Sequence, residues 1–120
     1  MQPMTNDQLR LIIQNARDYI EEGWTQRAMA RIGNGFGIDP VDPRATCWCL
    51  VGALRRATHF SNTMSFTENA FARSRRAFSQ AYNYLEPLIP YGEDMIGFND
   101  AEETTQEDVL KVLDTALKRL

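Results

Sequence analysis

The chain has 120 residues, of which 43% are hydrophobic and 24% are charged, and its formal net charge at pH 7 is −3. This length and composition are typical of one ordinary globular domain with a single core. No apolar run approaches the roughly 18 residues of a membrane span, and the N-terminus lacks the features of a signal peptide. With two cysteines and no disulfide framework, we expect a cytoplasmic protein.

The charges are unevenly distributed along the chain. Residues 86–108 contain eight acids and no base, whereas residues 44–76 contain six arginines and one acid. The acidic total argues against a general nucleic-acid binder. The two segments either pair with each other across the fold or solvate two separate faces. The arginines are Arg44, Arg55, Arg56, Arg73, Arg75 and Arg76.

The first predicted helix begins after Thr5 and ends at Gly23. Thr5 and Gln8 have the spacing of a capping box, and glycine is a common helix stop. An apolar stripe at helical spacing is formed by Leu9, Ile12, Ile13, Ala16 and Ile20. The residues that follow, 24–39, fit a short hairpin that turns at Gly33-Asn34-Gly35. Good helix formers at positions 26–31 leave a continued helix as the alternative.

A helix from Pro43 to about Thr58 is predicted to lie at the centre of the fold. Residues 45–54 carry no charge, and Asp42-Pro43 is a helix-start signal. A helix that is apolar on all sides is a buried one. Gly52 would allow another backbone to approach closely, with Trp48 beside it. We therefore expect a mainly α-helical, compact bundle of about four helices around this central helix, with a possible short β-hairpin after the first helix.

Two more helices are predicted in the second half of the chain. One begins near Ser65, where Glu68 completes a capping-box pattern, and is ended by prolines at positions 87 and 90. The other runs from about Thr105 to Arg119, with Thr104 and Glu107 as its expected capping box. Residues 91–100, between them, are expected to be a loop or a short helical turn.

Cys47, Cys49 and the single histidine, His59, are the candidates for metal or nucleophile chemistry. On a helix, residues two apart point about 200° away from each other, so the two thiols cannot hold one ion or form a disulfide. About ten residues of helix would separate Cys49 from His59 by about 15 Å, which argues against a nucleophile–base pair. We expect buried, structural cysteines, no metal and no cofactor.

Polar residues near two helix ends are the candidates for binding. Trp24 and Gln26 follow the first helix, and a buried Trp24 indole N–H would need a hydrogen-bond partner. Asn99 and Asp100 follow an aromatic residue in a loop before the last helix. This pair can hold a ligand or a partner's backbone, or it can form an Asx-turn that leads into the helix.

A basic face on the helix after residue 65 is the third candidate site. Arg73 and Arg76 share its polar side, and Arg75 lies beside them. Such a face can dock a phosphate-bearing partner. No aromatic residue alternates with these arginines, and no nucleic-acid-binding motif is present in the sequence.

Several short motifs together resemble a family of small proteins of unknown function found in bacteria and tailed phages. The resemblance covers roughly residues 16–117, with Phe98 at a position where the family tends to have tryptophan. It implies no activity, but it points to Trp24, Cys49, Asn99 and Asp100 and to a phage or prophage setting. The motifs are Gly23-Trp24-Thr25-Gln26, Asp42-Pro43, Trp48-Cys49-x-x-Gly52-Ala53-Leu54, Asn99-Asp100 and Thr105-x-x-x-Val109-Leu110-x-x-Leu113-Asp114-x-Ala116.

Three functions are compatible with these observations. The first is a non-enzymatic protein-interaction module of bacterial or phage origin that binds a host protein or a second copy of itself through a charged or aromatic surface. The alternative is a small-molecule-binding or enzymatic domain with a pocket near Trp24, Cys49, Asn99 and Asp100. The second alternative is nucleic-acid binding through the Arg73, Arg75 and Arg76 face. A homodimer is compatible with all three.

Overall fold

The computed structural model describes residues 4–60 and 70–120 and measures about 41 × 31 × 19 Å. Within these ranges the chain forms five α-helices and one two-stranded antiparallel sheet, so the prediction of a mainly α-helical fold is confirmed. The elements are α1 (Asn6–Glu22), β1 (Ala30–Arg31), β2 (Cys47–Trp48), α2 (Leu50–His59), α3 (Ala70–Leu85), α4 (Met95–Asp100) and α5 (Gln106–Lys118), with 3₁₀ turns η1 (Glu86–Leu88) and η2 (Pro90–Gly92) after α3.

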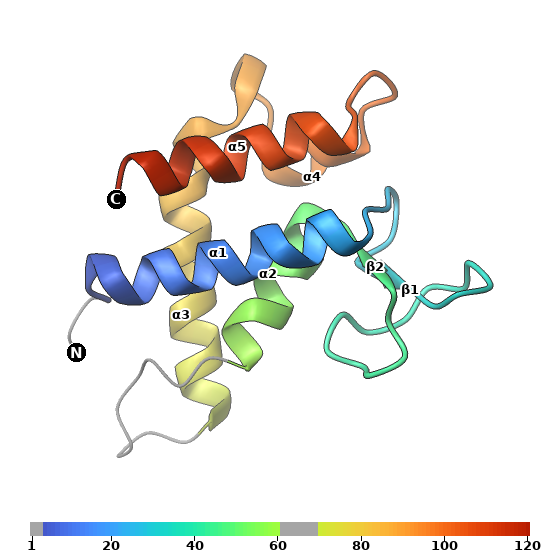
Figure 1. The fold of residues 1–120 in the computed structure, drawn as a ribbon, viewed down its shortest axis with the longest axis horizontal. Helices are drawn as coiled ribbons and strands as arrows, with labels where there is room; N and C mark the ends of the chain where they lie inside the picture. The colour runs from blue at the N-terminus through green and yellow to red at the C-terminus, as the bar shows by residue number, and fades with distance from the viewer. Residues whose placement is uncertain (1–3, 61–69) are drawn as a thin grey trace.

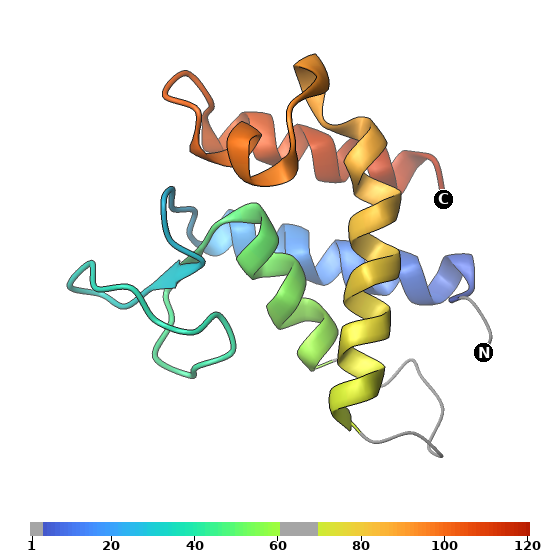
Figure 2. The same ribbon diagram turned by 180° about the vertical axis from the view of Figure 1, so that it is seen from behind.

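The helices pack in crossed layers (Figure 1). α1 and α5 lie side by side and antiparallel, and the Arg17 guanidinium on α1 pairs with the Asp114 carboxylate on α5. α3 crosses behind both, as the reverse view shows (Figure 2). α2 packs against α1, α3 and α4, which makes it the central helix of the fold. The segment that contains β1 and β2 extends from one end of the molecule (Figure 1).

The limits of α1 agree with its predicted signals. The Thr5 hydroxyl accepts a hydrogen bond from the Gln8 backbone N–H, and the Gln8 side chain accepts one from the Thr5 N–H, which completes the capping box. At the other end, the Gly23 N–H donates to the Tyr19 carbonyl. The helix buries one apolar side because its apolar residues recur at helical spacing. The fully buried residues are Ile12, Ile13, Ala16 and Ile20.

The predicted start of the central helix at Pro43 is wrong. α2 begins at Leu50, and Cys49 is its N-cap in an extended conformation. The residues before it pair with distant backbone: the Trp48 N–H donates to the Gly23 carbonyl, and the Cys49 N–H donates to the Met29 carbonyl. These bonds hold residues 46–49 in an extended conformation. Their backbone N–H groups are therefore not available for the hydrogen bonds of a helix. The Asp42 carboxylate instead accepts the backbone N–H of Arg44 two residues on, which is an Asx-turn.

The central position of α2 depends on a glycine. A Cβ atom at Gly52 would overlap the carbonyl oxygen of Met29, so only glycine lets the 29–30 backbone lie against the helix. The close backbone approach predicted at this residue is therefore confirmed. Trp48 is buried beside it, and its indole N–H donates to the Pro40 carbonyl at 3.0 Å.

The predicted hairpin is correct in part. Residues 30–38 do turn back on themselves, because the Ile32 N–H donates to the Phe36 carbonyl and the Ile38 N–H donates to the Ala30 carbonyl. The strand partner of β1 is nevertheless β2, with Ala30 opposite Trp48. The alternative, a helix over residues 26–31, is not formed. The sheet therefore joins the predicted hairpin to the segment that leads into α2.

The second half of the chain follows the predicted pattern with one shift. α3 ends at Leu85, directly before the proline-containing turns η1 and η2, while the expected capping box at Ser65 and Glu68 lies outside the described residues. A short helix, α4, occupies the expected loop or turn. The capping box of α5 is formed by Thr105 and Asp108 and not by Thr104 and Glu107, because Thr104 is buried and its N–H donates to the Ala101 carbonyl.

The described ion pairs connect α1 to α5 and neighbouring residues within loops and helices. Arg44 pairs with Asp42, while Arg55 lies over the ring of Phe78 and Arg56 over that of Trp48. None of these three arginines pairs with an acid of residues 86–108 within the described part of the chain. For these three residues, the pairing of the two charged segments across the fold is therefore not formed.

Candidate functional site

Asn99 connects three segments that are distant in the sequence. It lies in α4 with only 1% of its surface exposed. Its Oδ1 accepts hydrogen bonds from the Trp24 indole N–H at 2.8 Å and from the Leu50 backbone N–H at 2.9 Å. Its Nδ2 donates to the Thr25 carbonyl and to the Asp100 carboxylate. One amide thus fixes the segment after α1, the first turn of α2 and the end of α4.

Gln26 and Asp100 complete this arrangement. The Gln26 Nε2 donates to the carbonyl oxygens of Asn99 and Ala101 and so satisfies backbone acceptors at the C-terminal end of α4. The Asp100 carboxylate also accepts the backbone N–H of Arg27, at 2.9 Å. Arg27 has a φ of +63°, a left-handed backbone conformation that residues other than glycine rarely adopt. We call Trp24, Gln26, Asn99 and Asp100, with the backbone groups they bind, the Asn99 network.

The expectation of two buried cysteines on a helix is wrong for Cys47, which lies in β2 and is only partly buried. Cys49 is buried and caps the N-terminus of α2. Its Sγ accepts the Gly52 backbone N–H at 3.2 Å, and the residue is only 6% exposed. Burial raises the pKa of this thiol, and hydrogen bonds from backbone N–H groups oppose that rise only in part. A protonated, enclosed thiol is a poor nucleophile. His59 lies at the opposite end of α2, so the two residues form no nucleophile–base pair.

A cavity of about 370 Å³ opens on the protein surface beside the Asn99 network, and we call it the α4 cavity. Three of the predicted site residues line it, namely Cys49, Asn99 and Asp100. Trp24 and Gln26 do not line the cavity, but both bind Asn99. The remaining lining residues are Arg27, Ala28, Met29 and Ile96.

The predicted basic face lies elsewhere, on α3, which contributes no residue to the α4 cavity. Arg73 and Arg76 are half-buried, and Arg75 is exposed. The structure therefore separates the seven predicted site residues into two groups on different elements.

The sequence did not predict the apolar side of the cavity, nor the role of Arg31 in holding two turn segments together. Met29 and Ile96 belong to no sequence motif, and the structure places both in the lining of the cavity, where Ile96 is 54% exposed. Arg31 binds the Thr25 hydroxyl and the carbonyls of Gln26 and Gly35. The position of Arg31 between two turn segments could have indicated this role, because a guanidinium has five N–H donors and can bind several carbonyl oxygens at once.

The α4 cavity combines apolar and charged side chains. Apolar side chains form one wall, and the Asp100 carboxylate and the exposed Arg27 place opposite charges at the site. Among the described residues, no group of three or more histidine, cysteine or acidic side chains is placed to hold a metal ion. No helix in the described ranges has both the length and the apolar character to cross a membrane.

The fold and site thus define a mainly α-helical protein in which a buried amide network supports a surface cavity. The sequence profile of the family of unknown function DUF6197 matches residues 4–119, and the chain belongs to that family. No curated protein and no solved structure matches the chain at a significant level. The membership therefore brings no established activity to the α4 cavity.

Proposed function

We propose that this protein is a non-enzymatic interaction module, of bacterial or phage origin and cytoplasmic, that binds another protein at the α4 cavity. The observation that carries the proposal is how the polar groups are used. The Asn99 amide and the Trp24 indole N–H make their hydrogen bonds within the protein, and the Gln26 Nε2 donates to two backbone carbonyls. Cys49 is a buried helix cap. Such a site is preorganised for binding, and its one thiol serves as a helix cap.

The shape of the site favours a protein as the occupant. The α4 cavity is open and apolar on one side, and Ile96 projects beside it. Apolar pockets of this kind take single anchoring side chains at protein interfaces, and charged residues around them set the partner's orientation. We expect a partner that inserts an aliphatic or aromatic side chain between Met29 and Ile96, with flanking charges opposite to those of Arg27 and Asp100.

The test is affinity capture of the tagged protein from a bacterial lysate, with nuclease-treated and high-salt arms, using matched variants. Ile96→Arg places a charge on the apolar wall, and Ala28→Phe fills the cavity without changing charge. Leu11→Arg is the control, because Leu11 is 50% exposed on α1, outside the cavity. A partner that binds the wild type and Leu11→Arg, but neither cavity variant, supports the proposal.

Three outcomes would contradict it. Equal binding by all variants would place the interface elsewhere on the molecule, with the Arg73 and Arg76 face of α3 as the next surface to test by charge reversal. Loss of the partner in the nuclease arm would favour the nucleic-acid alternative. An empty capture would favour a small molecule as the occupant, or a second copy of the chain, which sedimentation of the purified protein detects.

A further inference from the structure

A second cavity lies where the turns after α3 and the loop between α4 and α5 face one side of α5 (Figure 2). We call it the α5 cavity, and its volume of about 390 Å³ falls within the usual range of small-molecule sites, about 300–1,000 Å³. It shares no lining residue with the α4 cavity. Its occupant is therefore independent of the function proposed above.

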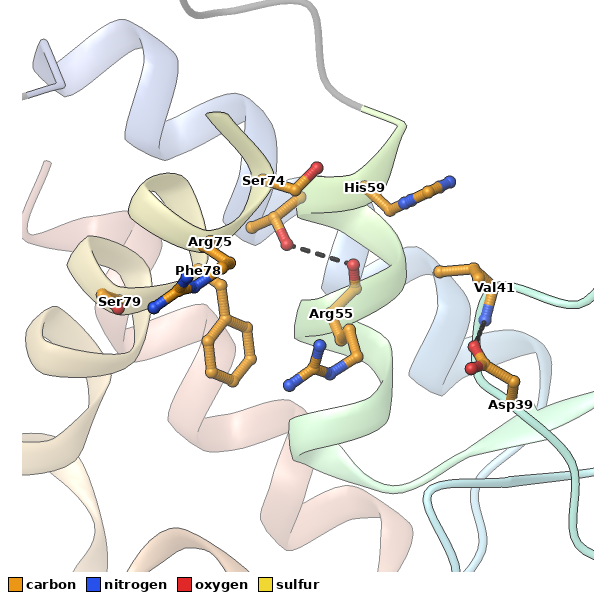
Figure 3. A pocket seen from close by; sticks show the side chains of 9 residues that line it. Asp39, Val41, Arg55, His59, Ser74, Arg75, Phe78 and Ser79 are labelled. Carbon is orange, nitrogen blue, oxygen red and sulfur yellow. Dashed lines mark hydrogen bonds between the residues drawn. The ribbon is translucent and has the colours of Figure 1, made fainter. Parts of the chain in front are cut away.

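The α5 cavity is acidic. The charged side chains that line it are three carboxylates and one ammonium, namely Glu93, Glu103, Asp108 and Lys111. These four side chains form no ion pair within the part of the chain that the structure describes. The acidic segment of the sequence, residues 86–108, thus supplies a concave site of negative charge. Arg55 and Arg75, from the basic segment, line a separate groove between α2 and α3 (Figure 3).

Thr104 brings an unused hydroxyl to the same cavity. The residue is only 9% exposed, and its N–H donates to the Ala101 carbonyl at 3.1 Å. Its Oγ1 forms no hydrogen bond with any of the described residues. This oxygen is not one of the described side-chain atoms that are fully enclosed without a partner, so it is reachable from the open space of the cavity. Because a buried hydroxyl without a partner is costly, an occupant that binds Thr104 removes that cost.

Asp108 is held close to this hydroxyl. Its Oδ2 accepts the backbone N–H of Thr105, the residue next to Thr104, at 2.9 Å. Its Oδ1 has no hydrogen-bond partner among the described residues. A hydroxyl and a carboxylate oxygen that both lack a partner suit an ammonium group, which has three N–H donors and no acceptor.

The apolar side of the cavity limits the shape of the ligand. Phe98 and Val112 are buried and line this side. The exposed Tyr91 ring lines the same space, and a cation can contact the face of such a ring. A ligand with an apolar body can therefore pack on Phe98 and Val112 while its charged end reaches the free polar atoms.

We propose that the α5 cavity binds a small organic cation, in which an ammonium group is carried on a compact apolar body. The ammonium donates to Thr104 Oγ1 and Asp108 Oδ1, and the other two carboxylates attract its charge. An anion would meet three carboxylates, and a neutral molecule would leave their charge uncompensated. The side chain of a partner's lysine shares this chemistry, but the concave space of ligand size favours a small molecule.

The probe is benzylammonium, titrated into the full chain while the Val112 methyl and Phe98 amide signals are followed by NMR. We expect saturable shifts with a Kd of about 1 mM or tighter. Thr104→Val keeps the shape of the side chain and removes the hydroxyl, so it should weaken binding about threefold or more. Its urea midpoint should not fall, because the hydroxyl has no partner in the protein to lose. Thr104→Ser is the matched control, since it retains the hydroxyl and should bind within about twofold of the wild type.

A second pair of variants tests the charge of the cavity. E93Q/E103Q removes two carboxylates from its lining and should weaken benzylammonium binding about fivefold. E22Q/E86Q removes the same net charge from two exposed residues outside the cavity, and we expect a change of less than about twofold there. Equal weakening by the two pairs would show attraction by net charge alone and overturn the proposal.

Other ligands complete the test. Benzyl alcohol has the same shape without the charge and should bind at least about tenfold more weakly. Equal binding of the alcohol and the ammonium, or no saturable shift below about 20 mM ligand, would overturn the proposal. Equal binding by Thr104→Val and the wild type would overturn the placement of the ammonium. Tighter binding of the peptide acetyl-Ala-Lys-Ala-amide than of benzylammonium would overturn the small-molecule assignment in favour of a partner's lysine.

Discussion

Asn99 uses every hydrogen-bonding position of its amide on the protein itself. Two N–H groups donate and the oxygen accepts twice, which is the full capacity of the side chain. The Asn99 residue is only 1% exposed, and an unpaired polar atom at such a buried position is costly. Asn99 therefore holds together the segments that surround the α4 cavity, and we expect it to contribute to the stability of the fold.

Asn99→Ala should lower the free energy of unfolding by about 3 kcal/mol, because it leaves the Trp24 indole N–H and the Leu50 N–H without their partner. Urea titration followed by circular dichroism measures the change. Asn83→Ala is the matched control, since Asn83 is exposed on α3, and we expect a change within about 0.5 kcal/mol there. Equal effects of the two substitutions would contradict a structural role for the Asn99 network.

Cys49 predicts a dependence of stability on alkaline pH. Because burial raises its pKa in the folded state, the native thiol keeps its proton at pH values where the unfolded thiol releases it. The unfolded state then binds fewer protons, so stability is unaffected at neutral pH and falls as pH rises through the ordinary thiol pKa of about 8.5. Urea titrations between pH 7 and 10 should show this decline, and Cys49→Ala should reduce it. An identical pH profile for Cys49→Ala would contradict the assignment.

At the scale of elements, the contact between α2 and the 29–30 backbone decides how the sheet meets the helices. Gly52 permits this contact because it has no side chain. The extended residues 46–49 pair with the same strand segment, and the Cys49 N–H donates to the Met29 carbonyl. Helix propensity alone favours alanine over glycine by about 1 kcal/mol. At Gly52 the local preference and the tertiary contact therefore act in opposite directions, and the structure shows that the contact prevails.

Gly52→Ala should destabilise the protein by about 3 kcal/mol or more, although alanine is the better helix former, because the added methyl group overlaps the Met29 carbonyl oxygen. Thermal unfolding and urea titration measure the loss. Gly33→Ala is the control, since a Cβ there meets no atom within 4 Å. A gain in stability for Gly52→Ala would show that the 29–30 backbone moves away without cost.

The sequence predicts α1 and α5 well and the start of α2 poorly, for a physical reason. Caps and apolar stripes are local signals, and Thr5 with Gln8 fixes the start of α1 from residues three apart. The start of α2 depends on pairing with Gly23 and Met29, which lie 25 and 20 residues upstream of their partners Trp48 and Cys49. Trp24, Gln26, Asn99 and Asp100 were identified by residue type and spacing, whereas the α4 cavity depends on Met29 and Ile96, which carry no local signal.

At the scale of the whole molecule, substitution of Leu50 tests how much α2 contributes to the stability of the core. Leu50 is fully buried in the first turn of the helix that packs on α1, α3 and α4. Leu50→Ala should cost about 2–5 kcal/mol of unfolding free energy in a denaturant titration, with both helical and aromatic signals lost in one transition. A cost below about 1 kcal/mol would contradict the central position of α2.

The Asn99 network also determines when the neighbouring part of the structure can form during synthesis. Its hydrogen bonds join α4 to residues 49 to 75 positions earlier in the chain. Contacts this far apart close late, because the intervening chain must first be ordered. During synthesis from the N-terminus, α1 and the sheet segment emerge long before Asn99 does. The α4 cavity can therefore form only after α4 has been made, when α1, α2 and α3 have already emerged.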